Sequence, residues 1–436
     1  MSGLFKVNDT IPNKISYYHI ILLMATLPFD MFYSHVVLIS FSLHTIINLK
    51  RESFKLLLKW RILILQSVFF ISLLTVIYAT NTSQGFNEVG KRSVIFLFPV
   101  LFFLNPLDLK KYRSQLFLSF SIICCVTIVY LYLDALITVR HYGLPLSILF
   151  SSAFTNHNFS EPINMHATFF SMQLALCLIY LISLFLKEQA LKVKLFYGAC
   201  IGTLIAGLIQ LSSKSVCIPL AAIVTFVVPY FLLTGMARSR FIYIAASLCI
   251  LMAAGVLSSG TLRDRYITQL TEDLSTTNRP HLEDSRLSRW HVTIGLIAKK
   301  PILGYGAGSE MPLLHDNFFK NKLYSSFINN LNAHNQYLSF LLKSGIMGLL
   351  LYTGTLAFGI RISYQKRDLL FFSFMIIVVA VSFSENFLDV DKGIIYYAFF
   401  FPFFLFSGKQ KTTTPKTKNQ DNYLAALATK ELVTPS

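Results

Sequence analysis

The chain is organised around the stretch Ser285-Arg-Leu-Ser-Arg-Trp290, its continuation Pro301-Ile-Leu-Gly-Tyr-Gly-Ala-Gly308, and its end at Asn332-Ala-His-Asn335. These motifs belong to one polar segment, residues 260–333, which separates two apolar runs. A connector between membrane helices rarely needs so many arginines, glycines and amides. We therefore expect this segment to carry the chemistry of the protein, and the apolar runs on both sides to hold it in position.

The composition indicates a polytopic membrane protein. Apolar residues make up 54% of the 436 residues and charged residues 14%, and the mean hydropathy is +0.58. The apolar share is higher, and the charged share lower, than in soluble globular proteins. A net charge of +17 would suit a nucleic-acid partner, but the lysines and arginines stand in short connectors between apolar runs. We therefore expect no nucleic-acid binding.

About twelve apolar runs approach the roughly 20 residues that a spanning helix needs. They cover residues 17–31, 33–49, 61–80, 93–105, 115–138, 165–186, 195–211, 215–234, 241–259, 335–360, 369–384 and 394–407. This predicts an all-α polytopic fold of about twelve transmembrane helices. Helices one to nine lie in residues 1–259, and helices ten to twelve in residues 334–407. A large helical loop, 260–333, separates them, and residues 408–436 form a disordered tail.

The distribution of basic residues predicts the orientation. Lysines and arginines gather in alternate connectors, around residues 50–61, 110–113, 187–194, 238–240 and 361–367. The positive-inside rule puts these connectors in the cytoplasm. Both termini are then cytoplasmic, and the large loop is on the outer face. Six cysteines stand within apolar runs without metal-ligand spacing, so we expect neither disulfides nor a metal site.

Within the loop, residues 263–274 predict a short amphipathic helix, and Asp284 or Ser285 can cap a second helix that runs to about Lys299. Arg286, Arg289 and Trp290 would share one face of that helix. The glycines of 304–308 predict a turn that approaches a ligand closely. The phenylalanine-rich apolar runs are expected to face lipid.

Several cations are candidates for binding an anion. Lys214 stands between two apolar runs with almost no loop, where an ionisable side chain is costly. Arg286 is suited to gripping phosphate oxygens, and Arg289 is a weaker candidate. A second set, Arg92 and Arg140 at the ends of spans together with Lys91, consists of anion ligands or interface anchors.

Two histidines are candidates for acid–base chemistry. His334 stands at the start of an apolar run, and an imidazole of near-neutral pKa suits a general base. Asn335, which follows it, is a candidate for binding the substrate. A histidine at a helix start is also often a simple polar cap. His166 opens another apolar run that is predicted to start on the same face, and it is a second candidate.

Taken in order, these motifs resemble the O-antigen ligase and O-antigen polymerase superfamily. The resemblance rests on Ser285-Arg286 with Trp290, on Pro301–Gly308, and on His334-Asn335-Gln336-Tyr337-Leu338 followed by Gly345. It covers roughly residues 60–405 and is strongest over 205–350. The large loop and the set of about twelve spans agree with it.

The resemblance implies a metal-independent, inverting glycosyltransferase of the C type without a cofactor. Such enzymes act on the periplasmic side of the inner membrane of Gram-negative bacteria. They move a glycan from undecaprenyl diphosphate to an acceptor, which in ligases is a sugar of lipid A–core. By position, Arg286 matches the loop arginine that contacts the diphosphate, and His334 matches the proposed base. Lys214 stands where the family has an arginine, and His166 resembles a variant of some branches.

Three alternatives remain open within and beyond this resemblance. A polymerase would use another lipid-linked repeat unit as acceptor, and a third branch uses a protein hydroxyl. A non-enzymatic exporter of lipid-linked sugars is also compatible with a polytopic chain. An exporter predicts internal repeats and buried polar residues within spans. The sequence has no visible repeat, and Asp134 and Lys343 are the main polar candidates within spans.

Overall fold

The computed structural model describes residues 7–49, 60–258, 260–273 and 284–408. Within these ranges the regular secondary structure is helical and contains no strand, which confirms the predicted all-α class. Seven helical segments are long and apolar enough to cross a membrane. They are α3 (Trp60–Thr75, extended by the turn Val76–Tyr78), α5 (Leu109–His141), α7 (Ala167–Phe185), α8 (Leu191–Leu211), α9 to α10 (Lys214–Ala222 and Val228–Leu232), α11 (Gly235–Ser258) and α17 (Gln336–Gln365).

The other helices are shorter or more polar. They are α1 (Ile11–Thr26), α2 (Met31–Ile47), α4 (Thr82–Leu104), α6 (His157–Ser160), α12 (Gly260–Arg263), α13 (Gln269–Asp273), α14 (Arg286–Ile297), α15 (Glu310–Lys320), α16 (Tyr324–Ile328), α18 (Leu369–Ser382) and α19 (Asp391–Ser407). Each predicted apolar run overlaps a helix, but twelve transmembrane crossings stay a prediction, as do the domain boundaries. The predicted tail lies outside the described residues, apart from its first residue, Gly408.

Helix α19 forms the centre of the protein, although the sequence suggested that its phenylalanines face lipid. Phe399, Phe400 and Phe404 have no exposed surface. Their rings pack against each other and against Phe98 of α4 and Phe117 of α5, with ring centroids 5.0–5.9 Å apart. The lipid-facing expectation was therefore wrong for α19, because an aromatic run of this size fills a core as readily as it faces lipid.

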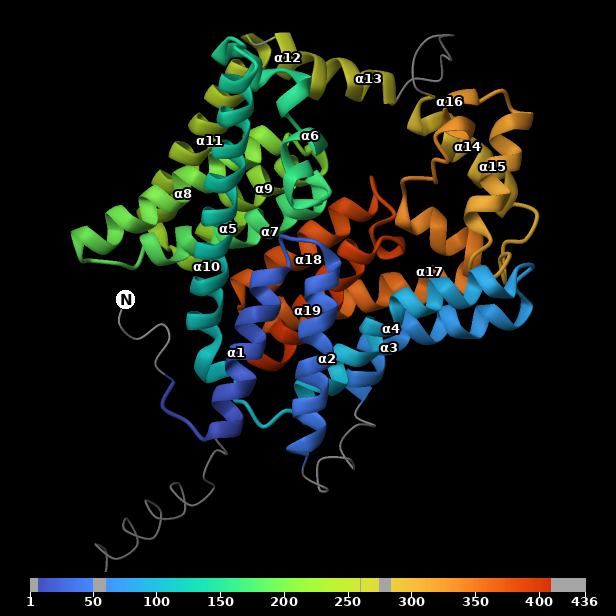
Figure 1. Cartoon of the computed structure of the whole chain (residues 1–436), viewed down its shortest axis with the longest axis horizontal. Coiled ribbons are helices and arrows are strands. Elements are labelled where there is room, and N and C mark those ends of the chain that lie inside the picture. Colours follow the sequence, from blue (N-terminus) through green and yellow to red (C-terminus); the bar gives the residue numbers. More distant parts are fainter. Residues whose placement is uncertain (1–6, 50–59, 259, 274–283, 409–436) are drawn as a thin grey trace, which may run out of the picture.

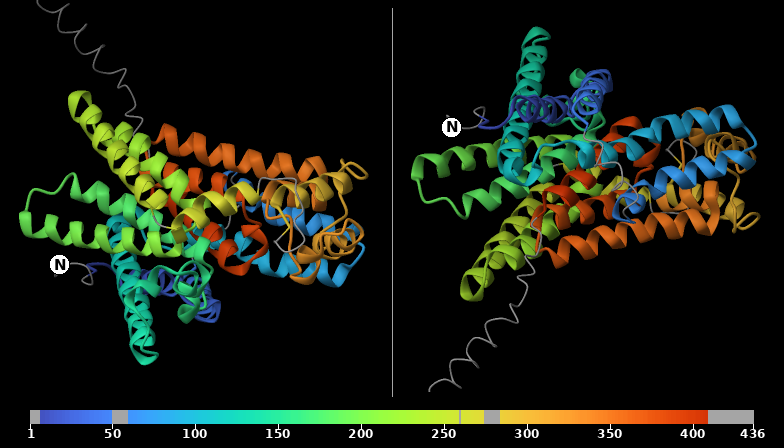
Figure 2. Two further views of the ribbon diagram at one scale, coloured as in Figure 1. Left: turned by 90° about the horizontal axis from the view of Figure 1, so that it is seen from above. Right: turned by 90° about the horizontal axis from the view of Figure 1, so that it is seen from below.

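The views from above and below place α18 and α19 between α17 on one side and α1, α2 and α5 on the other (Figure 2). Helices α14, α15 and α16 gather at one end of the molecule, beside the start of α17 and the start of α4 (Figure 1). Helices α14 and α15 thus pack against α17.

Helix α17 is broken at Gly345, whose φ of 60° and ψ of −161° are not helical. A break of this kind leaves backbone groups without partners, and these must be satisfied within protein. Three backbone hydrogen bonds with the polar segment pair these groups. The N–H groups of Tyr305 and Gly306 donate to the carbonyls of Leu342 (2.9 Å) and Lys343 (2.8 Å), and the Ile346 N–H donates to the Pro301 carbonyl (2.9 Å). The glycine turn is therefore fixed to the break in α17.

The polar segment also has a small core of its own. Leu296, Leu314, Phe318 and Leu323 are buried together, and Leu342 of α17 joins them. Each such side chain stabilises the arrangement by roughly 1.5–3 kcal/mol relative to an exposed position. Ser285 caps α14 by accepting a hydrogen bond from the Ser288 N–H at 3.1 Å, as the sequence predicted. The part of the segment from Ser285 onward thus has a core of its own and packs against α17.

Candidate functional site

Four of the predicted residues stand at the beginning of a helix. His166 is the N-cap of α7, Lys214 is the first residue of α9, Arg286 is the first residue of α14, and Asn335 is the N-cap of α17. The beginning of a helix carries unpaired N–H groups and a partial positive charge. Helix starts of this kind favour anionic ligands.

Two of these cations meet at one carboxylate. The Nζ atom of Lys214 lies 3.9 Å from Oδ2 of Asp273, and the Nε atom of Arg286 lies 3.4 Å from the same oxygen. The Arg286 guanidinium also donates a hydrogen bond of 2.8 Å to the carbonyl of Ser384. Asp273 thus places a negative charge between two cations that come from separate parts of the chain.

His334 forms a pair with an acidic residue that the sequence reasoning did not single out. Its Nδ1 atom lies 3.2 Å from Oε2 of Glu385, in the connector between α18 and α19. Its backbone N–H donates to the Asn332 side chain at 2.8 Å. The φ of His334 is 46°, in the left-handed region that non-glycine residues seldom adopt. The turn therefore holds the imidazole against Glu385 in spite of a strained backbone.

The charge state of Glu385 follows from its surroundings. Burial alone would raise the pKa of this carboxyl. The hydrogen bond from His334 and the neighbouring side chains of His334, His166 and Arg286 outweigh burial and lower the pKa to about 2. Glu385 is therefore ionised at neutral pH and pairs with His334. We call Lys214, Asp273, Arg286, His334 and Glu385 the cation–histidine cluster.

His166 lies beside this cluster. Its ring centroid is 4.1 Å from that of His157, and its Nδ1 accepts a hydrogen bond from the Thr168 N–H at 3.3 Å. The Ser213 hydroxyl donates to Thr168 at 3.3 Å, which ties the start of α9 to the start of α7. His166 is therefore near enough to act electrostatically on Glu385, and a role in binding stays a prediction.

Arg289 and Asn335 are more deeply buried than the cluster's cations. Arg289 is only 5% exposed, against 25% for the side chain of Arg286. The Asn335 side chain caps α17 by accepting from the N–H groups of Tyr337 and Leu338. Both residues support the helices around the cluster, and their predicted contacts with substrate remain untested.

The structure does not bring Arg92 or Arg140 into the cluster. The Arg92 side chain is 1% exposed, and its guanidinium contacts Glu88 at 2.7 Å and also Asp389. Arg140 is exposed at the end of α5. The geometry of Arg92 thus favours a structural role. Sequence spacing alone could not show this, because Asp389 is 297 residues away.

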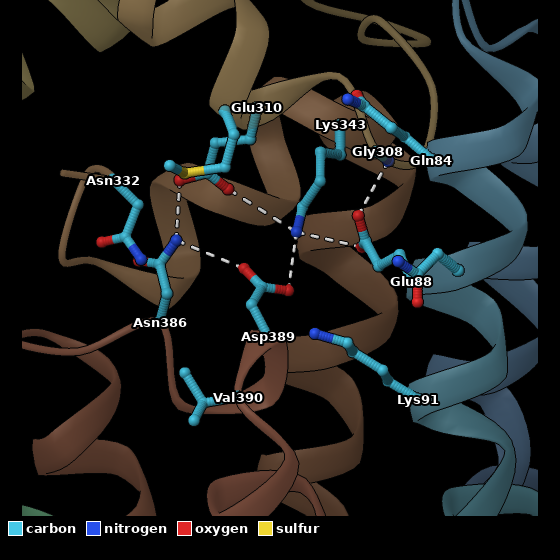
Figure 3. Close-up of a pocket in the computed structure, with 12 residues that line it drawn as sticks. Gln84, Glu88, Lys91, Gly308, Glu310, Asn332, Lys343, Asn386, Asp389 and Val390 are labelled. Carbon is cyan, nitrogen blue, oxygen red and sulfur yellow. Dashed lines mark hydrogen bonds and ion pairs between the residues drawn. The ribbon is translucent and has the colours of Figure 1, made fainter. Parts of the chain in front are cut away.

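Arg92 belongs to a second group, Glu88, Arg92, Glu310, Lys343 and Asp389, which we call the buried ion network (Figure 3). The ammonium of Lys343 stands at its centre, 3.0 Å from Glu88, 3.5 Å from Glu310 and 2.7 Å from Asp389. The Lys343 side chain is 2% exposed. Buried charges of this kind persist only when they are paired, so the network joins α4, α15, α17 and the connector before α19.

The pKa values of two acidic members of the network are shifted in opposite directions. Burial would raise the pKa of the Asp389 carboxyl, but Lys343 and Arg92 outweigh it and lower the pKa to about 2. Burial raises the pKa of Glu310 in spite of Lys343. The Asn386 amide donates to Glu310 at 2.7 Å and to Asp389 at 3.3 Å, while its oxygen accepts from the backbone of Asn335. Asn386 thus links the network to the start of α17.

Glu385 and Asp389 were not among the residues predicted from the sequence. They stand in a short connector, and connectors were compared by their basic residues, because these indicate membrane orientation. A possible signal was present in Ser384-Glu-Asn-Phe-Leu-Asp389, which puts two carboxylates and an amide between two apolar runs. Acidic residues at such a position call for buried partners.

The glycines 304–308 lie close to neighbouring backbone, and Gly308 also lines a cavity. Their predicted approach to a ligand stays a prediction. Gly304, Gly306 and Gly308 all have positive φ. A β-carbon at Gly304 would lie 2.6 Å from the backbone of Lys343, and one at Gly308 would lie 2.6 Å from the backbone of Gln84. The Gly308 N–H donates to Glu88 at 2.8 Å. The turn therefore positions the buried ion network.

No three His, Cys, Asp or Glu side chains in the described ranges are grouped so that they could hold a metal ion. The predicted independence of metal and cofactor stays a prediction. The cation–histidine cluster offers two cations for an anion and one imidazole oriented by a carboxylate. This set can bind a phosphate group and move a proton.

Comparison with known families agrees with this chemistry. Residues 199–353 match the family described as O-Antigen ligase, which confirms the predicted resemblance to that superfamily. The match contains Lys214, Asp273, Arg286 and His334, and it ends before Glu385. It supports an enzyme of the O-antigen ligase or polymerase family. No curated protein matches the chain.

Proposed function

Because residues 199–353 carry an O-antigen ligase domain, we propose that the protein is an O-antigen ligase, an inverting glycosyltransferase of the C type. It transfers a glycan from undecaprenyl diphosphate to a sugar hydroxyl of lipid A–core. The reaction takes place on the periplasmic side of the inner membrane and serves lipopolysaccharide synthesis. Membrane lipid surrounds the protein, and both termini are cytoplasmic.

One observation carries this proposal. Two cations, Lys214 and Arg286, approach one carboxylate oxygen of Asp273 within 4 Å, and Arg286 also acts electrostatically on the Glu385 that pairs with His334. An anion-binding pair and an oriented imidazole therefore stand together. Transfer from a diphosphate to a hydroxyl needs both, since a leaving group must be neutralised and a nucleophile must lose a proton.

His334 acts as the general base. A hydrogen bond from Nδ1–H to Glu385 fixes the neutral tautomer whose Nε2 lone pair accepts a proton. Nε2 takes the proton of the acceptor hydroxyl while the hydroxyl oxygen attacks the anomeric carbon. The ionised Glu385 stabilises the imidazolium that forms. Attack on the face opposite the leaving group inverts the anomeric centre.

Lys214 and Arg286 stabilise the departing diphosphate. As the bond between the anomeric carbon and the phosphate oxygen breaks, negative charge grows on that oxygen. Cations held in place for this charge lower the barrier without reorganisation. Asp273 occupies them while no substrate is present and is displaced by the diphosphate. Lys214 supplies charge but not the two-point grip of an arginine.

A transfer assay with purified protein tests the proposal. The donor is an undecaprenyl diphosphate-linked oligosaccharide, and the acceptor is lipid A–core without O-chains. We expect product in the presence of EDTA and a loss of about 100- to 10,000-fold in turnover for His334→Ala. A matched change at an exposed histidine, His291→Ala, should leave turnover unchanged. Equal activity in His334→Ala and wild type contradicts the assignment of the base.

Deletion of the gene separates ligase from polymerase. Loss of a ligase leaves lipid A–core without O-chains while long lipid-linked O-antigen accumulates. If the deletion leaves lipid A–core bearing a single repeat unit, the protein is a polymerase and the proposed acceptor is wrong.

A further inference from the structure

A cavity of about 510 Å³ lies between α2, α4 and α19, and the proposed reaction does not use it. We call it the α2–α4–α19 cavity. Its volume is within the range of small-molecule sites. Lys91 of α4 lines it and also lines the smaller cavity over the buried ion network (Figure 3).

The α2–α4–α19 cavity has a charged end and an apolar end. Helices α4 and α19 run in the same direction, because their rings meet in the same order along both helices, Phe98 with Phe399 and Phe102 with Phe403. On α4, Lys91 precedes the apolar lining residue Leu97. On α19, Asp391 precedes the apolar lining residue Ile395. The two charges therefore share one end of the cavity, and the apolar side chains lie farther along both helices.

The wall that α2 contributes continues into an exposed apolar face. Four side chains recur on α2 at intervals of three or four residues, which puts them on one face of the helix. They are Val36, Ile39, Leu43 and Ile46, and each is at least 50% exposed. Ile39 and Leu43 also line the cavity. An exposed apolar face of this kind marks contact with a membrane, so the cavity opens toward lipid.

The charges at the polar end are open to a ligand. Among the residues that the structure describes, neither Lys91 nor Asp391 takes part in an ion pair. Figure 3 shows the Lys91 side chain reaching toward Asp389. The Asp389 carboxylate is already paired with Arg92 and Lys343. The ammonium of Lys91 thus remains available for a further anion.

The signs of these charges select the headgroup. A phosphate beside Lys91 forms a charge-assisted hydrogen bond with the ammonium. A headgroup with a second, positive group also pairs with Asp391, whereas a purely anionic headgroup places its charge beside a carboxylate of the same sign. A diphosphate brings still more negative charge against a single lysine. Charge complementarity therefore favours phosphoethanolamine, which carries one phosphate and one ammonium.

We propose that the α2–α4–α19 cavity binds one phospholipid of the surrounding membrane, with a phosphoethanolamine headgroup. The phosphate meets Lys91, and the headgroup ammonium meets Asp391. One acyl chain lies along the apolar lining, which includes Leu38, Leu97 and Ile395. The bound lipid joins α2 to the α4–α19 pair. This site is separate from the proposed transfer and does not depend on it.

Gly90→Phe tests the site with little risk to the fold. Gly90 lines the cavity, and a β-carbon there meets no atom within 4 Å, so the new ring takes the space of the lipid and not of packed protein. Gly202→Phe on α8 is the matched control, because a β-carbon there also meets no atom within 4 Å. Unfolding midpoints in detergent check that both variants are folded.

Lipid retention is measured by native mass spectrometry. The protein is incubated in micelles with equal amounts of phosphatidylethanolamine and phosphatidylglycerol of the same acyl chains. We expect wild type and Gly202→Phe to retain phosphatidylethanolamine at least about fivefold over phosphatidylglycerol. In Gly90→Phe, retention of phosphatidylethanolamine should fall at least about tenfold.

Two charge variants test the headgroup. Lys91→Gln should reduce retention of both phospholipids about fivefold, because one lysine that attracts phosphate is lost. Asp391→Asn should weaken phosphatidylethanolamine alone, so that the two phospholipids are retained about equally. Lys192→Gln on the exposed surface of α8 is the control and should change neither.

Three outcomes overturn the inference. The first is equal retention of phosphatidylethanolamine by wild type, Gly90→Phe and Gly202→Phe. The second is equal retention of the two phospholipids by wild type. The third is displacement of the retained phospholipid by added undecaprenyl diphosphate, which would assign the cavity to the donor. Because no transfer is measured, failure of the proposed reaction leaves this test intact.

Discussion

The cation–histidine cluster and the buried ion network are built from similar residues but differ in packing. In the cluster, the ion pairs are 3.2–3.9 Å long and the cations Lys214 and Arg286 are 15% and 25% exposed. In the network, Lys343 and Arg92 are 2% and 1% exposed, and carboxylate oxygens lie within 3.0 Å of their nitrogens. Loose, partly exposed pairs can exchange a partner for a ligand, whereas tight buried pairs hold elements together.

The largest expected effect is on stability, at the network. Lys343→Met removes the central cation and leaves Glu88, Glu310 and Asp389 with Arg92 alone. Breaking a buried pair in this way costs about 3–5 kcal/mol, so the midpoint of thermal unfolding in detergent should fall strongly. Lys320→Met on the surface of α15 is the control and should leave the midpoint unchanged. If the midpoint of Lys343→Met is unchanged, the buried ion network does not hold the elements together more firmly than the cation–histidine cluster does.

The next effect is on catalysis, at the cluster. Arg286→Ala should reduce turnover about 100- to 1,000-fold, because one cation aimed at the growing charge is lost. The unfolding midpoint should stay close to that of wild type, since the Arg286 side chain is partly exposed. Arg361→Ala on the exposed surface of α17 should leave both quantities unchanged. A large loss of stability in Arg286→Ala would show that this arginine belongs with the structural group.

A smaller effect is expected at Glu385, and it depends on pH. The pKa of about 2 lies below the ordinary value of 4.5, so ionised Glu385 stabilises the fold above pH 4.5 and this stabilisation is lost as the pH falls toward 2. Glu385→Gln should therefore be less stable than wild type at pH 7, by on the order of 2–3 kcal/mol. The difference in unfolding free energy should shrink between pH 4.5 and pH 2. If the difference in unfolding free energy does not change with pH, the charge of Glu385 is not its cause.

The smallest effect sharpens the role of Lys214. Lys214→Arg restores the side chain that the resembling family has at this position and keeps the charge. We expect turnover and donor KM within about threefold of wild type, whereas Lys214→Ala should raise the donor KM at least tenfold. If Lys214→Arg is as impaired as Lys214→Ala, the contact depends on the shape of lysine and not on its charge.

The sequence was sufficient for the helical class, for a cap at Asp284 or Ser285 and for the resemblance through Arg286 and His334. Periodicity and local capping, which act over a few residues, decide the first two features, and the order of the motifs carries the third. The partners of those side chains could not be predicted from the sequence. Glu385 is 51 residues from His334, and Asp389 is 297 residues from Arg92. Pairing across such distances depends on tertiary packing, which no local pattern encodes.

The glycines 304–308 and the phenylalanines of α19 show the other limit. A glycine turn fits close to a ligand or close to protein, and the close contacts with the backbone of Lys343 and Gln84 become visible only in the folded chain. A phenylalanine run fits lipid or core, and only its neighbours on α4 and α5 decide for core. In both cases the residue type allows two kinds of neighbour, and the sequence does not show which neighbours the folded chain provides.

The position of Asp389 has a consequence for the order in which the chain is assembled. Arg92 enters the membrane early during synthesis, and Asp389 emerges almost at the end. In the interval, the partner of Arg92 is Glu88, four residues earlier on the same helix, which forms its ion pair as soon as α4 does. The ion pairs of Lys343 join it to Glu88, Glu310 and Asp389, and none of these residues stands on its own helix α17. The buried ion network is therefore complete only after the connector before α19 has been synthesised. A chain truncated before this connector lacks Asp389, the carboxylate nearest to Lys343.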